Sequence, residues 1–349
     1  MRCESGVEGS RTTARQPVRS PAVWSAPDVA DSTGWSVRLT SQERAAIVDA
    51  ANRAVDQGRT VATIDRSDFD LPVLRPGVAQ WVEALSSGRG FVLLRGFPIE
   101  DLSPEAAELA YVGLGVQLGT PGGQDADASL VGHVRDEGIP RTGPSVRFYR
   151  TRERQDFHTD GSDIVGLLCL QRAKAGGESR IVSSFAVYKE ILRRCPDLTE
   201  VLYEPMFWDR NGEESPGEDP FFAILVFNDL GGTPRVFYIG WYIRDAQRHA
   251  QVPPLTDAQL EALDLIESIA NDPELYLEMD FEPGDVQLLS NAKILHSREA
   301  YVDHPEPERR RHLLRLWLTA YDFTSVDEVL RGGIPRRNES GHSSTTKGA

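Results

Sequence analysis

The stretch Phe157-His158-Thr159-Asp160-Gly161 determines how the rest of the chain is interpreted. His158 and Asp160 are two positions apart, so on an extended strand both side chains point to the same face. A second histidine, His296, lies far downstream. One carboxylate and two imidazoles form the 2-His-1-carboxylate triad, which binds ferrous iron and leaves coordination positions open. A third ligand from so distant a segment requires a sheet that folds back on itself.

The composition is that of an ordinary globular protein, with 349 residues, 40% hydrophobic and 26% charged. A net charge of -15 disfavours binding to nucleic acid or to an anionic membrane surface, although one local arginine still suffices for a small anion. The chain lacks an apolar run of about 18 residues and an apolar signal-peptide core. Three cysteines without paired spacing favour a reducing, cytoplasmic location, with Cys169 in an apolar run as a core residue.

The chain divides into three regions. Residues 1–35 are rich in Ser, Arg, Pro and Gly, which predicts a disordered leader, and residues 338–349 form a similar tail. Residues 36–337 form a single domain. Helices are predicted at residues 41–57, 78–85, 103–114, 184–194 and 256–270, with Ser41 as the N-cap of the first. Short strands are predicted at residues 90–96, 146–149, 163–172, 180–184, 222–227, 235–238, 286–290 and 313–321. This pattern is typical of a mainly β fold with flanking helices, a sandwich or jelly roll.

The segment after His296 carries a run of arginines that ends in a strand, Arg310-Arg311-His312-Leu313-Leu314-Arg315-Leu316-Trp317-Leu318. Strand alternation places Arg311 and Arg315 on one face and His312 on the other. A guanidinium binds a carboxylate through two parallel hydrogen bonds, which is what a dicarboxylate needs inside a barrel.

These segments together resemble the iron(II)- and 2-oxoglutarate-dependent dioxygenases of the taurine dioxygenase and clavaminate synthase group. The matching segments are residues 90–96, 157–161, 175–179, 283–285, 291–298 and 310–318. Their order and spacing are specific, although each is weak alone. The resemblance implies a distorted jelly roll, a double-stranded β-helix, with iron between its two sheets.

The resemblance also implies roles for single residues. His158, Asp160 and His296 match the iron ligands. Arg311 matches the arginine that pairs with the distal carboxylate of 2-oxoglutarate, and Ser179 stands where many relatives place a threonine that helps bind it. Arg315 matches a second arginine, and the spacing from His296 leaves open which of the two arginines anchors the keto acid.

The implied reaction uses O2 and decarboxylates 2-oxoglutarate to succinate and CO2 while a small molecule is hydroxylated or desaturated. The carboxylate of Asp160 disfavours halogenation, because halogenating relatives have Ala or Gly there. An amino-acid-derived or natural-product scaffold is the family-level expectation, with no nucleic acid or membrane partner and an undetermined oligomeric state. Polar residues just before the iron motif are candidates for substrate contact: Gln124, His133, Arg147 and Tyr149.

Simpler interpretations remain open at each position. His158 and Asp160 also suit a strand histidine and a turn former, and Arg311 suits a surface arginine. His304 fits an exposed loop, and Trp241 and Trp317 fit the core. At the level of the whole protein, the alternatives are a non-catalytic jelly-roll binding or sensor protein and a metalloenzyme that uses no keto acid.

Overall fold

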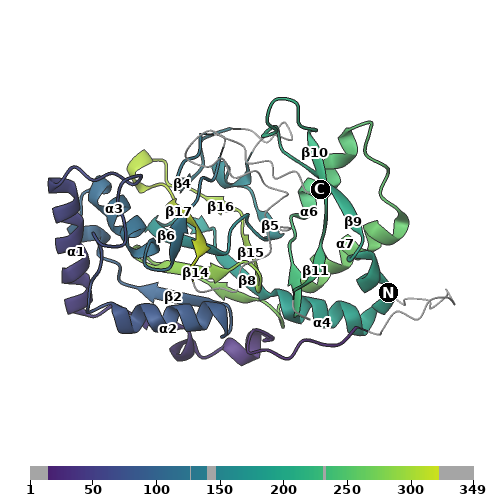
Figure 1. The fold of residues 1–349 in the computed structure, drawn as a ribbon, viewed down its shortest axis with the longest axis horizontal. Helices are drawn as coiled ribbons and strands as arrows, with labels where there is room; N and C mark the ends of the chain where they lie inside the picture. Colours follow the sequence, from purple (N-terminus) through teal and green to yellow (C-terminus); the bar gives the residue numbers. More distant parts are fainter. Residues whose placement is uncertain (1–14, 126, 140–146, 231–232, 322–349) are drawn as a thin grey trace, which may run out of the picture.

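The computed structural model describes residues 15–125, 127–139, 147–230 and 233–321. It is mainly β with flanking helices, as the sequence predicted (Figure 1). A 7-stranded sheet has the strand order β1-β2-β14-β6-β17-β3, with β4 also paired to β17. Its strands are β1 (Ser36–Arg38), β2 (Phe91–Arg95), β14 (Val286–Ser290), β6 (Ile164–Gln171), β17 (His312–Ala320), β3 (Gly119–Pro121) and β4 (Val131–Val134).

A second, 4-stranded sheet has the order β13-β8-β15-β5. Its strands are β13 (Leu277–Met279), β8 (Ser179–Ser183), β15 (Ile294–Arg298) and β5 (Gln155–His158). The antiparallel register of β15 and β5 sets His296 directly opposite His158. Segments more than a hundred residues apart in sequence are therefore joined at this point.

The two sheets face each other across a shared apolar cluster. Phe91, Val165 and Leu289 of the large sheet pack with Ile181 and Ile294 of the small sheet. Side chains alternate between the two faces of a strand, so the same strands direct their other residues away from this cluster. The result is a sandwich of two sheets, in which the end of β5 lies beside the middle of β15.

Three further pairs of short strands lie in the described part of the chain, and the first of them borders the aromatic cavity described below. They pair β9 (Pro205–Asp209) with β10 (Phe221–Leu225), β11 (Phe227–Leu230) with β12 (Thr233–Val236), and β7 (Ala175–Gly176) with β16 (Tyr301–Val302). The predicted strand at residues 146–149 is wrong in its described part, which forms the 3-10 helix Phe148–Arg150.

Helices cover the outer sides of both sheets (Figure 1). The large sheet is covered by α1 (Ser41–Asp56), α2 (Arg75–Ser86) and α3 (Pro104–Gly115). The small sheet and hairpins pack against α4 (Ser184–Arg194), α5 (Pro196–Val201), α6 (Gly240–Asp245) and α7 (Asp257–Ala270). Thr40, rather than Ser41, caps α1, because its Oγ1 accepts from the Glu43 amide at 3.2 Å while the Glu43 carboxylate accepts from the Thr40 amide.

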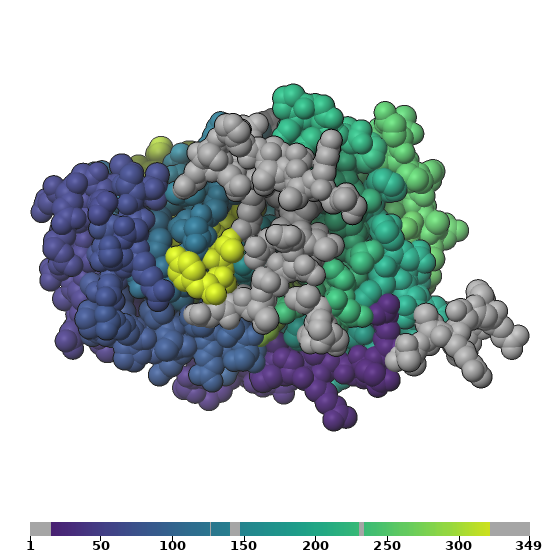
Figure 2. Space-filling model, in the orientation of Figure 1, coloured from purple at the N-terminus to yellow at the C-terminus, as the bar shows by residue number. Residues whose placement is uncertain are grey.

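The predicted disorder of the leader is wrong for residues 15–35. Trp24 and Trp35 are buried, and their rings pack against Phe91 with centroids 5.3 and 5.7 Å away. Their indole nitrogens donate to the carbonyls of Arg89 and Val29. Figure 2 shows this segment in purple along the lower edge of the molecule. Two buried tryptophans supply enough apolar contact to offset the ordering of a polar segment.

The remaining predictions about the chain ends, for residues 1–14 and for the tail 338–349, lie outside the described residues. Cys169 is free and buried, as expected, whereas Cys195 is disulfide-bonded, which the cysteine spacing did not predict. None of the helices in the described part of the chain has the length and apolar character needed to cross a membrane.

Candidate active site

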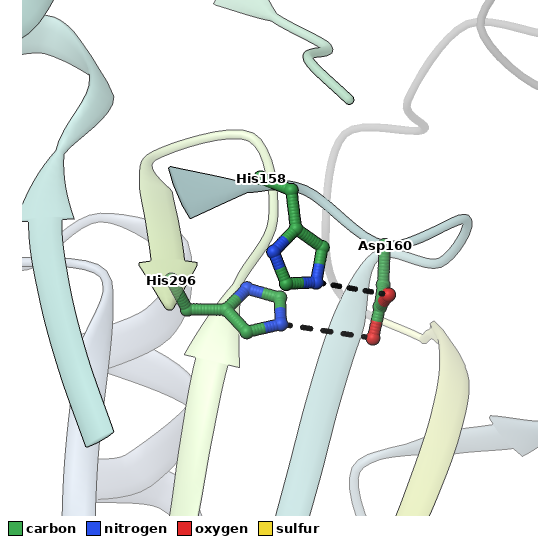
Figure 3. Close-up of side chains that lie close together, drawn as sticks. All are labelled: His158, Asp160 and His296. Carbon is green, nitrogen blue, oxygen red and sulfur yellow. Dashed lines mark ion pairs between the residues drawn. The ribbon is translucent and has the colours of Figure 1, made fainter. Parts of the chain in front are cut away.

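The structure brings His158, Asp160 and His296 together, and one potential ligand atom from each lies within 4.8 Å of the others (Figure 3). His158 ends β5, Asp160 lies in the turn that follows, and His296 projects from β15. The His158 Nε2 lies 3.7 Å from Asp160 Oδ1, and the His296 Nε2 lies 3.8 Å from Asp160 Oδ2. All three side chains are buried.

The protonation states of this triad suit a metal. Burial lowers the pKa of His158, and it lowers the pKa of His296 to about 3, with the neighbouring His158 reinforcing the effect. Burial would raise the pKa of Asp160, but Arg315 and the two imidazoles outweigh it and hold that pKa at about 2. At neutral pH the carboxylate is ionised and both imidazoles are neutral, as ligation requires.

The orientation of His158 also suits a metal. Its Nδ1 donates to the Asp156 carbonyl at 2.8 Å, so Nε2 carries the lone pair. The Gln155 amide nitrogen lies 3.0 Å from that Nε2. In a catalytic site, the partner on the far nitrogen normally fixes the tautomer of a histidine ligand. The donor set and its tautomer therefore fit ferrous iron.

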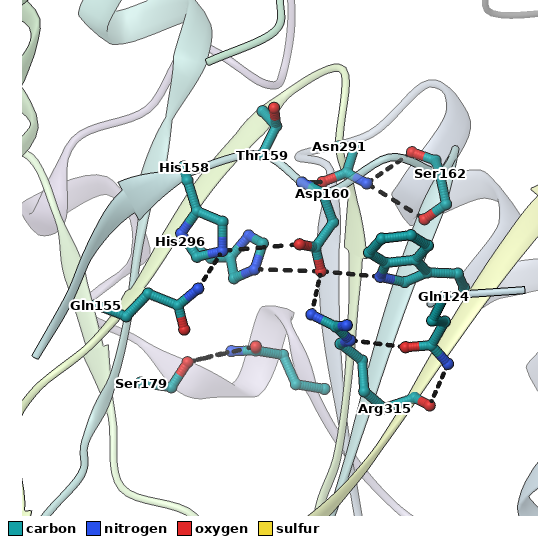
Figure 4. Close-up of polar contacts among 12 residues, drawn as sticks. Gln124, Gln155, His158, Thr159, Asp160, Ser162, Ser179, Asn291, His296 and Arg315 are labelled. Atoms are coloured by element: carbon teal, nitrogen blue, oxygen red, sulfur yellow. Dashed lines mark hydrogen bonds and ion pairs between the residues drawn. The ribbon is translucent and has the colours of Figure 1, made fainter. Parts of the chain in front are cut away.

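Asp160 is held on three sides (Figure 4). Its backbone amide donates to Asn291 Oδ1 at 3.0 Å, and the Asn291 amide donates to the carbonyl of Ser162. Its Oδ2 accepts from Trp317 Nε1 at 2.9 Å and from Arg315 Nη1 at 3.4 Å. These contacts fix both the turn and the rotation of the carboxylate.

A small cavity beside His158 and His296 contains three buried arginines, Arg298, Arg311 and Arg315. Among the described residues, Nε and Nη1 of Arg298, Nη1 of Arg311 and Nη2 of Arg315 have no hydrogen-bond partner. Buried unpaired N–H groups on charged side chains are costly, so they indicate a missing anion.

Two of these arginines flank one tyrosine. The guanidinium carbons of Arg298 and Arg311 both lie 5.1 Å from the centre of the Tyr301 ring. Burial and the charge of Arg311 lower the pKa of Arg298 to about 10, and burial lowers the pKa of Arg311. Ser179 lines the same cavity. Its Oγ accepts from Gln287 Nε2 at 3.2 Å and donates to Gln287 Oε1 at 3.4 Å. The cavity is strongly cationic, which fits a dicarboxylate.

A larger cavity also borders the triad, at His158 and Asp160. Its walls include Phe148, Trp208, Phe222, Phe237, Trp241 and Tyr242. Arg147 and Tyr149 line this cavity, as their assignment as substrate candidates requires. The Arg147 guanidinium is paired with the carboxylate of Glu213, from the loop between β9 and β10. The aromatic side chains suit the apolar body of a substrate, and the Arg147–Glu213 ion pair suits a charged group on it.

Of the other two substrate candidates, Gln124 lies at this cavity and His133 does not. Gln124 lines the cavity, but its Oε1 accepts from Arg315 Nε at 2.7 Å and its Nε2 donates to the carbonyls of Leu130 and Arg315. Its polar atoms are thus occupied within the protein. His133 is not among the cavity residues; its Nδ1 lies 2.9 Å from Nε2 of His312, to which β4 and β17 bring it.

The sequence did not point to several residues of the site, among them Arg298 and Trp317. Arg298 is two positions after His296 on β15 and therefore shares its face. Trp317 is two positions after Arg315 on β17, and its indole reaches Asp160 instead of serving only the core. In both cases the sequence held a usable signal. Side chains alternate along a strand, so a residue two positions from an identified site residue shares its face.

Comparison with known proteins identifies the family of the chain. The model of the family "Taurine catabolism dioxygenase TauD, TfdA family" matches residues 55–317. FR-33289 synthase of Streptomyces rubellomurinus is 36% identical over 307 residues, covering 87% of this chain and 91% of that protein. A uridine-5'-phosphate dioxygenase of an Amycolatopsis species is 26% identical, covering 74% of this chain and 92% of that protein.

Solved structures show the same fold at low sequence identity. An asparagine oxygenase in complex with Fe(II), hydroxyasparagine and succinate has a TM-score of 0.63 at 19% identity, covering 82% of this chain and 94% of that one. The oxygenase OrfP in complex with Fe and alpha-ketoglutaric acid has a TM-score of 0.58 at 16% identity, covering 81% and 94%. With its buried His-Asp-His triad beside a cationic cavity, this chain belongs to the TauD/TfdA family of iron- and 2-oxoglutarate-dependent dioxygenases.

Proposed function

We propose that the protein hydroxylates or desaturates a small molecule and converts 2-oxoglutarate to succinate and CO2 in the same cycle. One observation carries this proposal: the triad borders two cavities, one with unpaired arginine N–H groups beside His158 and His296 and a larger aromatic one beside His158 and Asp160. One cavity suits a small dianion and the other suits an organic substrate. Both would then meet at the metal.

His158, Asp160 and His296 hold the iron in this proposal, within a fold of the distorted double-stranded β-helix type. Ferrous iron and 2-oxoglutarate, when bound, supply the oxidising power that cleaves a C–H bond with O2. The chain's own contribution is to keep Asp160 ionised, keep both imidazoles neutral, and place the substrate beside them. A carboxylate at position 160 supports hydroxylation or desaturation over halogenation.

Arg311 anchors the distal carboxylate of 2-oxoglutarate, with Ser179 as a neighbouring hydroxyl. Arg311 Nη1 and Arg315 Nη2 both have no partner among the described residues, but Nε and Nη1 of Arg315 already donate to Gln124 and Asp160. The orphan donor and the absence of Arg311 from the larger cavity support Arg311 as the anchor. Arg298 adds positive charge to the same cavity and strengthens its preference for a dianion.

The substrate is proposed to be amino-acid-derived or to have a natural-product scaffold. Relatives are named for a uridine phosphate substrate and for an FR-33289 product, and neighbouring structures hold hydroxylated asparagine and arginine. In this chain, Arg147, Glu213 and Tyr149 would bind the polar part of the substrate, and Trp208, Phe222 and Trp241 its apolar part. Gln124 and His133 are not included.

A succinate-release screen against amino acids, their derivatives and nucleotides tests the reaction. The proposal expects succinate to form in proportion to oxidised product when Fe(II), 2-oxoglutarate, O2 and a substrate are all present. Arg147→Gln should raise the KM for that substrate while leaving the affinity for 2-oxoglutarate unchanged. Product formation that does not require 2-oxoglutarate would favour a metalloenzyme without a keto acid, and iron-dependent ligand binding without turnover would favour a sensor.

The boundaries of the catalytic domain, residues 36–337, and a cytoplasmic location remain predictions. The packed segment at residues 15–35 supports extending the folded unit toward the N-terminus. Partial proteolysis followed by mass measurement of the surviving fragment would define the boundary.

A further inference from the structure

We propose that Trp317, Arg315 and Gln124 form a carboxylate clamp that fixes the rotation of Asp160 and thereby sets the affinity of the site for its metal. The inference rests on the proposed function in one respect, that the triad binds a metal. It assigns Trp317 and Gln124 as positioning residues, which act through Asp160.

The clamp holds one oxygen of the carboxylate. Trp317 Nε1 donates to Asp160 Oδ2 at 2.9 Å and Arg315 Nη1 donates to the same atom at 3.4 Å (Figure 4). No clamp residue donates to Oδ1, which lies 3.7 Å from His158 Nε2. Two donors on Oδ2 stop the carboxylate from rotating and keep Oδ1 toward His158, while Oδ2 itself lies 3.8 Å from His296 Nε2.

Gln124 holds Arg315 in place. Its Oε1 accepts from Arg315 Nε at 2.7 Å, and its Nε2 donates to the Arg315 carbonyl at 2.8 Å. The same Nε2 donates to the carbonyl of Leu130. Gln124 is only 3% exposed, so this pairing is shielded from water. The Arg315 guanidinium is further sandwiched, with its carbon 4.7 Å from the ring centres of both Tyr149 and Trp317.

Burial makes the clamp energetically important. Asp160, Arg315 and Trp317 are 7%, 5% and 7% exposed. Hydrogen bonds to a buried carboxylate are charge-assisted and are stronger than neutral ones. Groups that hold a metal-binding carboxylate typically change metal affinity by about 10- to 100-fold when they are removed. Without Trp317, Oδ2 would keep only the longer contact from Arg315.

The chain offers a matched control in Trp208. Trp208 and Trp317 both line the larger cavity and both are buried. The Trp208 Nε1 has no hydrogen-bond partner among the described residues, whereas the Trp317 Nε1 is bonded to Asp160. Replacing either tryptophan by phenylalanine removes the same atoms, but only the change at position 317 removes a bond to a triad residue.

The test measures Co(II) binding to the metal-free protein by equilibrium dialysis, without 2-oxoglutarate or substrate. We expect Trp317→Phe to weaken Co(II) binding by about 10- to 100-fold and to shift the d–d absorption of the bound cobalt. Trp208→Phe should stay within about threefold of the wild type. Equal affinity in the two variants, or an equal loss in both, would overturn the clamp.

Two further measurements keep the test decisive. Arg315→Lys retains the charge but loses the planar fork, so it should also weaken Co(II) binding, by about tenfold. If Trp317→Phe does not fold, as judged by its circular dichroism, wild-type affinity in Arg315→Lys would reject the clamp. Failure of the wild-type protein to bind Co(II) at all would instead reject the metal site, and with it the proposed function.

Discussion

Arg311→Gln should separate the binding of 2-oxoglutarate from the binding of iron. The Arg311 guanidinium is 5% exposed, and its Nη1 has no partner among the described residues. Bound 2-oxoglutarate would provide that partner. Glutamine keeps one N–H donor and a similar length but removes the charge and the planar fork.

The magnitude follows from the burial of the pair. Removing one partner of a buried ion pair costs about 3–5 kcal/mol, because the other charge is left uncompensated. At about 1.4 kcal/mol per tenfold change, the dissociation constant for 2-oxoglutarate should rise by roughly 150-fold to a few thousand-fold. Arg298 remains in the same cavity and still attracts the dianion, so we expect the lower end of this range.

The assay is anaerobic titration calorimetry of 2-oxoglutarate into the iron-loaded protein. Arg310→Gln is the control, because Arg310 is exposed and, within the described residues, its guanidinium donates to the carbonyls of His304 and Pro305. That variant should bind within about threefold of the wild type. If Arg311→Gln also binds within threefold while Arg315→Gln loses affinity, the anchor is Arg315 and the reasoning is refuted.

Three further predictions follow from the same contacts. His158→Ala or His296→Ala should abolish stoichiometric iron binding without unfolding the protein, as measured by metal analysis and circular dichroism; wild-type iron content in either variant would contradict the triad. Trp35→Ala should lower the free energy of unfolding by about 3–5 kcal/mol in urea, because the ring is buried against Phe91 and its Nε1 donates to the Val29 carbonyl; a loss below about 0.5 kcal/mol would mean that the leader does not pack. In the metal-free protein, stability should fall as the pH drops from about 6.5 toward about 3, because the pKa of His296 is lowered to about 3 in the folded state and the unfolded chain binds a proton first. The loss should be on the order of 3 kcal/mol by about pH 4, and an equally steep slope in His296→Gln would contradict this assignment.

Features encoded by local sequence patterns could be predicted well. The strand after the arginine run, the helix at residues 184–194 and the strand at residues 286–290 depend on local periodicity, and the structure has them at those positions. The grouping of His296 with His158 and Asp160 was implied by the resemblance to the dioxygenase family. The two-residue spacing concerned only His158 and Asp160, and Asp160 lies beyond the end of β5.

Features that depend on distant partners could not be predicted. Trp24 and Trp35 order the leader only because Phe91 lies beneath them, and the composition of the leader carries no sign of that contact. The pairing of β4 with β17 places His133 beside His312. No local sequence pattern specifies that pairing. Trp317 was expected in the core because its apolar ring fits there, while the partner of its N–H lies 157 positions away.

The most direct test of the account is anaerobic visible spectroscopy of the protein with Fe(II) as 2-oxoglutarate is added. Chelation of iron by the keto acid produces a weak charge-transfer band in the visible region. We expect this band to appear with the wild-type protein, to saturate at one equivalent of 2-oxoglutarate, and to be absent from His296→Ala. A wild-type protein that binds Fe(II) but shows no band on addition of 2-oxoglutarate would contradict the central claim.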